Sequence, residues 1–286
     1  MLKELVRRTM PAEAISVLRA VKLYYSTRTY HPKVVRHRYG ESSFSLHIND
    51  PFAEHAYDHD WSELKELSLL KRHQLQPGAT VFNLGAHQGV VALMLADDVG
   101  ETGQVIAVEA SPYSAGICEA NRAANKADNL KVINAAIAAE QGSLRFADSL
   151  CGHVDDGHGG IEVPARTIDD LMDEYGHPAI LFIDIEGFEC EALRGASRTL
   201  SIGSDCFVEV HGGVGLEKYG GSVAKVLSFF PADDYELFFA IEEGAEFSPL
   251  TDRTHVTERL QGKRWFLVAT SKRKAPNALI SALNGS

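Results

Sequence analysis

A glycine turn and an acidic residue, each following an apolar run of sequence, are the first residues whose types and spacing could bind a ligand. Gly85 and Gly89 come after the run 80–84, and Glu109 follows the run 105–108. Glycines let a backbone approach a ligand closely at a helix N-terminus, where free N–H groups point outward. A carboxylate at the end of the second strand, where Glu109 stands, accepts hydrogen bonds from two ribose hydroxyls and repels a 2′-phosphate. The pattern therefore predicts a site for a cofactor that carries a nucleoside.

The spacing of these glycines discriminates between kinds of nucleotide. A dinucleotide fold uses G-x-G-x-x-G, whereas this turn is G-x-x-x-G, with His87 where the middle glycine would stand. The difference disfavours a pyrophosphate packed on the turn, and with it an NAD-dependent oxidoreductase. A structural turn beside a solvated Glu109 is the alternative interpretation, since isolated glycine motifs are weak evidence.

Two carboxylates and a histidine form a second candidate group. Asp184 and Glu186 are two positions apart at the end of the apolar run 180–185, so in an extended segment their side chains share a face. His211 ends the next such run, 207–210. In a parallel sheet all three side chains would reach the same edge, although either carboxylate alone could be a solvated helix cap.

Alternating strand and helix patterns predict the elements that must position these residues. Short apolar runs separated by helix-compatible stretches indicate an α/β fold with a parallel, doubly wound sheet, which binds ligands beyond the carboxyl ends of its strands. We expect the strand order 3-2-1-4-5, which places the strand before the glycine turn beside the strand before Asp184. The expected strands are 80–84, 105–108, 131–137, 180–185, 207–210, 235–241 and 265–270, with a hairpin at 143–147 and 161–165 and helices at 90–98, 114–124, 167–175, 189–200 and 223–230.

An extension precedes this alternating region. Its predicted elements are helices at 2–10 and from Pro11, a hairpin of 34–39 and 43–48, an aromatic and acidic loop at 51–61, and then a helix at 63–75. The loop side chains either cover the mouth of the ligand site or pack between the extension and the sheet; they are His55, Tyr57, His59 and Trp61. The expected boundaries are 1–62 for the helices, hairpin and cap segment, 63–275 for the main domain, and 276–286 for a flexible tail.

Charge is unevenly distributed along the 286 residues. The net charge is −11, but the first 38 residues carry nine basic and two acidic side chains, or +7, which leaves −18 for the rest. An acidic main domain argues against a nucleic-acid substrate, which would need clustered lysine and arginine. The basic extension could dock on the acidic domain, on a second copy of the chain, or on an anionic membrane surface. No run reaches the roughly 18 apolar residues of a membrane span, and four scattered cysteines predict a reducing, cytoplasmic location.

Several motifs together resemble those of FkbM-type methyltransferases. The resemblance covers roughly residues 55–270 and rests on the order and spacing of the motifs, not on any single one. The motifs are Gly85-Ala86-x-x-Gly89, Glu109, Arg-Thr-Ile-Asp-Asp-Leu at 166–171, Ile-Asp-Ile-Glu-Gly-Phe-Glu at 183–189, Leu-Arg-Gly-Ala at 193–196 and Glu-Val-His at 209–211. The resemblance implies the seven-stranded, Rossmann-like fold of S-adenosylmethionine-dependent methyltransferases, in the order 3-2-1-4-5-7-6 with an antiparallel last strand. It also implies O-methylation of a hydroxyl on a sugar, a glycolipid or a natural product.

The same resemblance implies a set of residues around S-adenosylmethionine. They are Glu63, Asn83, Gly85, Ala86, His87, Gly89, Glu109, Ala110 and Asp184. Three positions depart from the family pattern, because Asn83 stands for the usual Asp, His87 for Asn and Phe182 for Lys. Asn83 carries no charge to offset the ammonium of the cofactor, so we expect Glu63 or Asp184 to supply it. The departures would also suit a catalytically silent binding module, which is the alternative to an enzyme.

If the reaction is methyl transfer, then Asp184, Glu186 and His211 each have an expected role in it. The reaction is an in-line displacement that needs an aligned oxygen nucleophile and, for a hydroxyl, a base. His211 is the expected base, since an imidazole with a pKa near roughly 6.5 is largely neutral at pH 7. Asp184 and Glu186 are expected to attract the ammonium of the cofactor. A rival hypothesis is that these three residues hold a divalent metal ion that acidifies the hydroxyl; no metal is expected, because the same side chains suit acid–base work.

Overall fold

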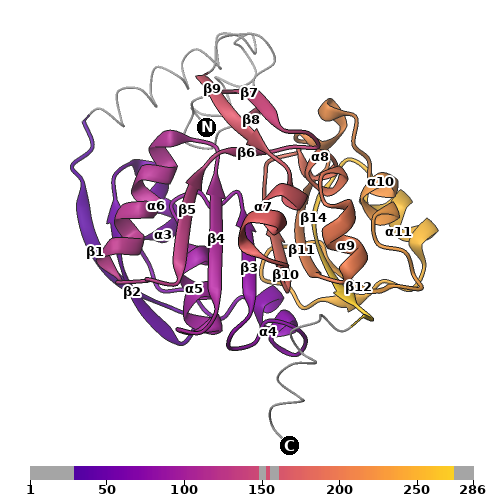
Figure 1. Cartoon of the computed structure of the whole chain (residues 1–286), viewed down its shortest axis with the longest axis horizontal. Helices are drawn as coiled ribbons and strands as arrows, with labels where there is room; N and C mark the ends of the chain where they lie inside the picture. The colour runs from indigo at the N-terminus through magenta and orange to yellow at the C-terminus, as the bar shows by residue number, and fades with distance from the viewer. Residues whose placement is uncertain (1–28, 148–152, 155–160, 274–286) are drawn as a thin grey trace, which may run out of the picture.

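The computed structural model describes residues 29–147, 153–154 and 161–273 (Figure 1). The helices predicted at 2–10 and from Pro11 lie outside these residues, as does the tail 276–286, and the domain boundaries stay a prediction. None of the helices in the described part of the chain combines the length and apolar character needed to span a bilayer.

An eight-stranded sheet forms the centre of the molecule. Its strands are β3 (Thr80–Leu84), β4 (Gln104–Glu109), β5 (Leu130–Asn134), β10 (Ile180–Ile183), β11 (Asp205–His211), β12 (Tyr235–Ala240), β13 (Ser248–Pro249) and β14 (Arg264–Ser271). They lie in the order β13-β12-β14-β11-β10-β3-β4-β5, and β14 runs antiparallel to both of its neighbours (Figure 1). This is the order 3-2-1-4-5-7-6 with the two-residue β13 added at the edge. The site predicted between the first and fourth strands therefore lies between β3 and β10.

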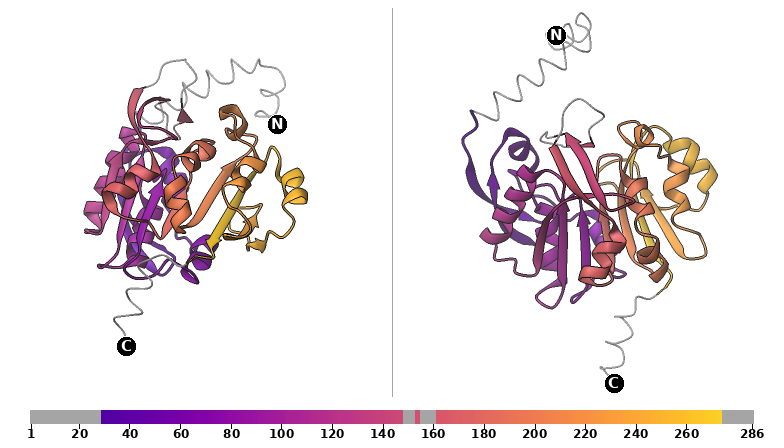
Figure 2. Two further views of the ribbon diagram at one scale, coloured as in Figure 1. Left: turned by 45° about the vertical axis from the view of Figure 1, so that its right-hand side comes forward. Right: turned by 45° about the horizontal axis from the view of Figure 1, so that its top comes forward.

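Helices cover both faces of the sheet (Figures 1 and 2). The helices are α3 (Pro51–Tyr57), α4 (Lys65–Lys71), α5 (Val90–Val99), α6 (Pro112–Ala124), α7 (Ile168–Tyr175), α8 (Glu189–Arg194), α9 (Ser197–Ile202), α10 (Val223–Ser228) and α11 (Arg253–Leu260), with a 3-10 turn η1 at Leu216–Tyr219. Helices α7 to α11 bury their apolar side chains with Phe82 and Leu84, whereas α3 to α6 pack on the face of Val81. A strand buried on both faces reads as one continuous apolar run, which explains the sequence pattern.

Three local predictions are wrong in detail. The helix expected at 189–200 is two helices, because the carbonyl of Gly195 accepts a hydrogen bond from the Asp169 N–H instead of continuing the helical ladder. The strand expected at 131–137 divides between β5 and the separate β6 (Ala136–Ile137). The loop expected at 51–61 begins with α3, because Asp50 caps its N-terminus and Pro51 suits the first helical position.

A second, smaller sheet stands at the edge of the central sheet where β4 and β5 end (Figures 1 and 2). Its order is β6-β9-β7-β8, and its further strands are β7 (Gly142–Ala147), β8 (His153–Val154) and β9 (Ile161–Arg166). The predicted hairpin is the antiparallel pair of β7 and β9. Phe146 and Val163 pack on Ala136, so the small sheet has a core of its own beside the end of β4.

The N-terminal hairpin of β1 (Lys33–Tyr39) and β2 (Ser42–Ile48) packs on α5 and α6 and shares their core. Its backbone is tied to α6 by side chains. The N–H of Ser45 donates to Oδ1 of Asn125 at 2.8 Å, and the N–H of His47 donates to Oδ1 of Asn121 at 2.7 Å. The hairpin, α5, α6 and the face of the central sheet that these helices cover therefore form one packed unit.

Replacing Asp50 with alanine is expected to lower the free energy of unfolding by about 3 kcal/mol, since hydrogen bonds to charged groups contribute more than neutral ones. Asp50 is fully buried and accepts hydrogen bonds from the Ala53 N–H at 2.8 Å, the Gln88 amide at 2.8 Å and the Tyr113 hydroxyl at 3.2 Å. Urea unfolding monitored by circular dichroism measures the change. Glu54→Ala on the same helix is the control, and an equal loss in both variants would contradict the argument.

Glu66 gives the stability of the fold a predicted pH dependence. Burial, with the nearby carboxylates of Glu209 and Glu243, raises the pKa of Glu66 to about 7. An acid whose pKa is raised on folding binds its proton more tightly in the folded state, so stability falls as pH rises from 4.5 to 7. Glu66→Gln is therefore expected to gain up to about 3 kcal/mol over wild type at pH 8 and little at pH 5. A gain of the same size at both pH values, or one matched by Glu63→Gln, would contradict this cause.

Candidate active site

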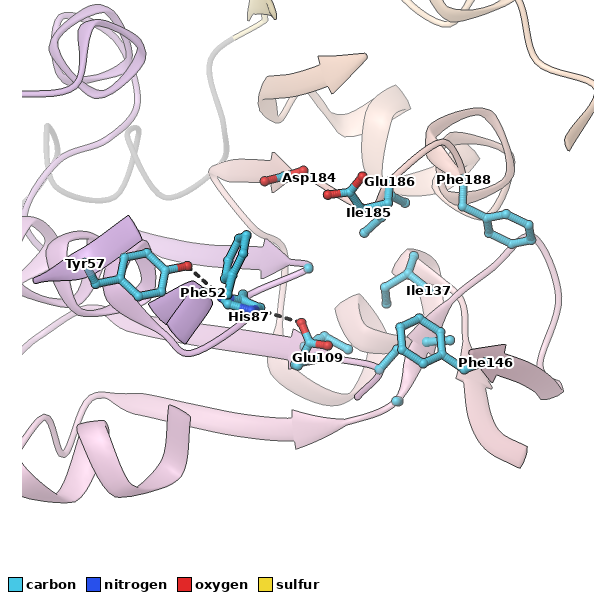
Figure 3. A pocket seen from close by; sticks show the side chains of 15 residues that line it. Phe52, Tyr57, His87, Glu109, Ile137, Phe146, Asp184, Ile185, Glu186 and Phe188 are labelled. Atoms are coloured by element: carbon cyan, nitrogen blue, oxygen red, sulfur yellow. Dashed lines mark hydrogen bonds between the residues drawn. The ribbon is translucent and has the colours of Figure 1, made fainter. Parts of the chain in front are cut away.

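A cavity opens at the carboxyl ends of β3, β4 and β10, at the point where the strand order reverses (Figure 3). Its walls come from the turn after β3, the end of β4, the segment after β10, the small sheet and α3. The labelled side chains in Figure 3 are Phe52, Tyr57, His87, Glu109, Ile137, Phe146, Asp184, Ile185, Glu186 and Phe188. Members of the two predicted groups thus meet at one cavity, with Glu109 across from Asp184 and Glu186, whereas Gly89 and His211 are not among its lining residues.

Glu109 is held in place by the backbone around it. Its side chain is largely buried, and its two oxygens accept hydrogen bonds from the N–H groups of His87 and Ser111, each at 2.7 Å. Burial raises the pKa of Glu109, although these N–H groups and that of Ala110 oppose the shift. A carboxylate has about four lone-pair sites, so Glu109 can still accept hydrogen bonds from a ligand. Ala110 lines the cavity beside it.

The two glycines of the turn are required by packing as well as by any ligand. Both have left-handed backbones, with φ of +83° at Gly85 and +85° at Gly89. A Cβ on Gly85 would lie 1.7 Å from the carbonyl oxygen of Asp184, and one on Gly89 would lie 2.5 Å from Sγ of Cys118. Gly85 lines the cavity, whereas Gly89 faces Cys118. The absence of a side chain at Gly89 thus permits contact between α5 and α6, and its approach to a ligand stays a prediction.

Aromatic side chains from α3 close one side of the cavity. The hydroxyl of Tyr57 lies 2.6 Å from Nδ1 of His87, and the ring of Phe52 meets the His87 ring edge-on at 5.3 Å. Of the four residues expected at the mouth, only Tyr57 lines this cavity. The ring centroid of Trp61 lies 5.3 Å from that of Tyr39 in the hairpin, which agrees with the alternative prediction that these aromatic residues pack against the extension. The sequence analysis did not include Phe52, although the helix-start signal of Asp50 and Pro51 could have marked the following residues as a helix.

Asp184, Glu186 and His211 come together as predicted. Nε2 of His211 lies 3.6 Å from Oδ1 of Asp184 and 3.5 Å from Oε2 of Glu186. Two further carboxylates surround the ring, with Glu189 at 2.7 Å from Nδ1 and Glu209 at 3.2 Å from Nε2. Both stand in the family motifs at 183–189 and 209–211, but neither was predicted as a site residue. Glu209 could have been found, because it is two positions before His211 and shares its strand face.

The carboxylates around His211 favour the protonated form of its ring, which weighs against the predicted role as a neutral base. Burial alone would lower the pKa of His211, but hydrogen bonds to Glu189 and Glu209 outweigh that effect and raise it to about 11. The imidazole therefore carries a proton at neutral pH in this arrangement. The pKa of Asp184 is also raised, by burial first and then by the charge of Glu209. A carboxylate with a raised pKa is the better candidate for accepting a proton.

Several residues of the predicted cofactor set lie away from the cavity. Glu63 pairs with Lys71 at 3.4 Å and lines a different hollow, so its binding of the cofactor stays a prediction that this position does not support. Asn83 is buried within the sheet, where its Oδ1 has no hydrogen-bond partner. Ala86 is also buried, and its N–H donates to the carbonyl of Val108. None of these three lines the cavity.

Phe182 belongs to the hydrophobic core. Its ring stacks on that of Phe207 at 4.3 Å, and both side chains pack in the core that the hairpin shares. The substitution of an aromatic residue for the usual lysine thus extends the apolar face of β10 into β11. It places no side chain in the cavity.

Two non-glycine residues with left-handed backbones flank the cavity. His87 has φ +48° and Glu186 has φ +52°, and each lines the cavity from its own side. Such conformations cost of order 1–3 kcal/mol, and they concentrate at functional sites. Together with the perturbed pKa values of Asp184 and His211, they mark this cavity as the candidate active site.

Comparison with known proteins gives a family. A family model described as the methyltransferase FkbM domain matches residues 83–237, which include both groups of cavity residues. Among solved structures, an FkbM methyltransferase from Methylobacillus flagellatus is 17% identical, with a TM-score of 0.43 over 66% of this chain and 43% of that one. A putative O-methyltransferase from Klebsiella pneumoniae is 15% identical, with a TM-score of 0.45 over 72% of this chain and 78% of that one.

The range of the family match decides the assignment. No curated protein sequence matches the chain. The chain spans less than half the length of the Methylobacillus protein, so nothing about that whole protein carries over. The family model, in contrast, covers more than half of the 286 residues. On that ground, this chain belongs to the FkbM methyltransferase family.

Proposed function

We propose that the protein is an S-adenosylmethionine-dependent methyltransferase whose acceptor is a hydroxyl group of a sugar, a glycolipid or a natural product. The observation that carries the proposal is Glu109, a largely buried carboxylate that lines the cavity where the strand order reverses. An acid in this place suits two ribose hydroxyls. The glycine spacing of the adjoining turn disfavours a dinucleotide.

The residues present fit an adenosyl cofactor. Glu109 would hold the ribose, while Ile137, Phe146 and Ala110 offer an apolar surface for a flat base. Asp184, across the cavity, would take over the negative charge that Asn83 lacks. When bound, the cofactor supplies a methyl group on a positively charged sulfonium.

The chain itself would position the acceptor and manage its proton. Asp184 and Glu186 line the cavity and can accept hydrogen bonds from a hydroxyl, which orients its oxygen for in-line attack. Asp184 also has the raised pKa that favours proton acceptance. His211 is protonated between four carboxylates, so we assign it the role of holding Asp184 and Glu186 in place. Phe52 and Tyr57 would keep water from one side of the cavity.

Transfer of a labelled methyl group tests the proposal. The full chain is incubated with methyl-labelled S-adenosylmethionine and a panel of sugars, glycolipids and natural-product alcohols, and with amine and thiol analogues as controls. We expect label on a hydroxyl compound. Binding of S-adenosylmethionine without transfer across the panel would favour a silent binding module, and binding of NAD(H) in a fluorescence titration would favour an oxidoreductase.

A further inference from the structure

We propose that Asp184, Glu186 and His211 bind a divalent cation of the Mg²⁺ or Mn²⁺ type, and that Glu189 orients His211 for it. The proposed function needs no metal ion, so this site goes beyond it. The inference rests on the proposed function only for the role of the cation, because binding is measured without turnover.

The spacing of the three side chains suits one ion. One nitrogen of His211 and one oxygen from each of Asp184 and Glu186 all lie within 4.8 Å of one another. In an octahedral site with bonds of about 2.1 Å, neighbouring ligand atoms are about 3 Å apart. The distances from Nε2 are 3.6 Å to Asp184 and 3.5 Å to Glu186, so these two distances exceed the octahedral value by only about half an ångström. Both carboxylates are partly exposed to the cavity and have room to move.

Glu189 gives the histidine the support that a ligand needs. Its side chain is fully buried, and its Oε1 lies 2.7 Å from Nδ1 of His211 and accepts a hydrogen bond from the Gly187 N–H at 2.7 Å. A carboxylate on one ring nitrogen fixes the orientation of the ring and leaves the other nitrogen to face the metal. Nε2 is the nitrogen that faces Asp184 and Glu186, and the ion would displace the proton that this nitrogen carries when no metal is bound.

The number of carboxylates around His211 is a separate sign that positive charge belongs here. Glu189, which contacts Nδ1 of the ring, also has a buried Oε2 without a hydrogen-bond donor. Glu189 and Glu209 add their charges to those of Asp184 and Glu186 around a single imidazole, while Arg264 pairs with Glu209. Buried carboxylates are costly unless they are paired or coordinate a metal. A divalent ion offsets two of these charges, whereas a single ammonium offsets one.

The backbone at residues 186–187 has an uncommon, left-handed conformation. Glu186 has φ +52° and the next residue, Gly187, has φ +105°. A Cβ on Gly187 would lie 2.6 Å from Cα of Gly215, so the loop after β11 packs directly against this turn. This packing fixes the backbone that carries Glu186 beside Asp184 and His211.

The cation would act on the acceptor. Held by Asp184, Glu186 and His211, the ion would supply Lewis-acid assistance that lowers the pKa of the acceptor hydroxyl, so the proton could pass to solvent and Asp184 would serve as a ligand in place of a base.

Binding of Mn²⁺ to the full-length protein tests the inference. The protein is treated with EDTA, desalted and titrated with Mn²⁺, and free Mn²⁺ is followed by electron paramagnetic resonance. We expect one bound Mn²⁺ per chain. Glu186→Gln, which changes a partly exposed side chain, is expected to weaken binding at least about 10-fold, and Glu189→Gln about 10- to 100-fold. Glu191→Gln, on the same helix as Glu189 but paired with Arg194, is the matched control and should bind as wild type does.

The outcomes separate this inference from the proposed function. No bound Mn²⁺ in the wild type, or equal binding by Glu186→Gln and the control, would overturn it. The titration is repeated with S-adenosylhomocysteine, whose own binding is measured by calorimetry. Retained Mn²⁺ supports the inference, whereas displacement of Mn²⁺ shows that the ammonium of the cofactor is the cation of this cluster. Binding of S-adenosylhomocysteine without any Mn²⁺ would leave the proposed function standing and the metal site excluded.

Discussion

Gly85→Ala is expected to lower the free energy of unfolding by about 4 kcal/mol, which corresponds to a loss of about 10 °C in Tm for a protein of this size. The new Cβ would lie 1.7 Å from the carbonyl oxygen and 2.8 Å from the carbonyl carbon of Asp184. These are backbone atoms, so the end of β3 would have to move away from the end of β10. The left-handed φ of +83° adds its own cost for a residue with a side chain.

Gly100→Ala separates the two causes. Gly100 also has a left-handed φ, of +64°, but a Cβ there meets nothing within 4 Å. This variant is expected to lose only about 1 kcal/mol, through backbone strain alone. Thermal unfolding of both variants by calorimetry measures the difference. Equal losses would show that the contact with Asp184 contributes nothing, and would contradict the packing of β3 against β10 described here.

Glu109→Gln is expected to weaken binding of S-adenosylmethionine by about 10- to 100-fold, because a hydrogen bond to a charged group contributes about 1.5–3 kcal/mol. The amide keeps the shape of the side chain but has one acceptor oxygen in place of two. One of the N–H groups of His87 and Ser111 would then face an NH₂ group instead of an oxygen. The loss would therefore include both a weaker hold on the ribose and a less ordered turn.

Glu119→Gln is the matched control for this change. Glu119 is exposed on α6, where it pairs with Arg122 one turn away. It is expected to bind S-adenosylmethionine as wild type does, because surface pairs contribute little. Isothermal titration calorimetry with both variants measures the effect. An unchanged affinity in Glu109→Gln would show that the cofactor does not use this carboxylate.

The layers of the fold follow from local sequence patterns. Strands such as β3 and β4 are apolar on both faces, and this continuous run distinguishes a parallel sheet from a half-exposed one. The division of residues 131–137 between two sheets was not predictable in the same way. β5 and β6 have similar apolar composition, and only tertiary pairing of Ala136 with β9 separates them. The break between α8 and α9 likewise depends on a distant partner, Asp169.

The part of the candidate site that lies at the ends of strands was predictable from the sequence. Glu109, Asp184 and His211 each end a strand or follow it directly, so the sheet alone brings them together. Asn83 and Glu63 were assigned through family resemblance, and the structure places neither side chain in the cavity. The protonation of His211 could not be predicted, because it depends on its contact with Glu189. That contact is made possible by the left-handed turn at residues 186–187, which precedes Glu189.

A co-crystal structure with S-adenosylhomocysteine tests the central claim most directly. The account predicts the nucleoside in the cavity between β3, β4 and β10, with its ribose hydroxyls within hydrogen-bonding distance of Glu109. Its amino-acid part would lie toward Asp184. A nucleoside bound at another hollow, such as the one between α5 and residues 125–129, or one in this cavity with its ribose away from Glu109, would contradict the account.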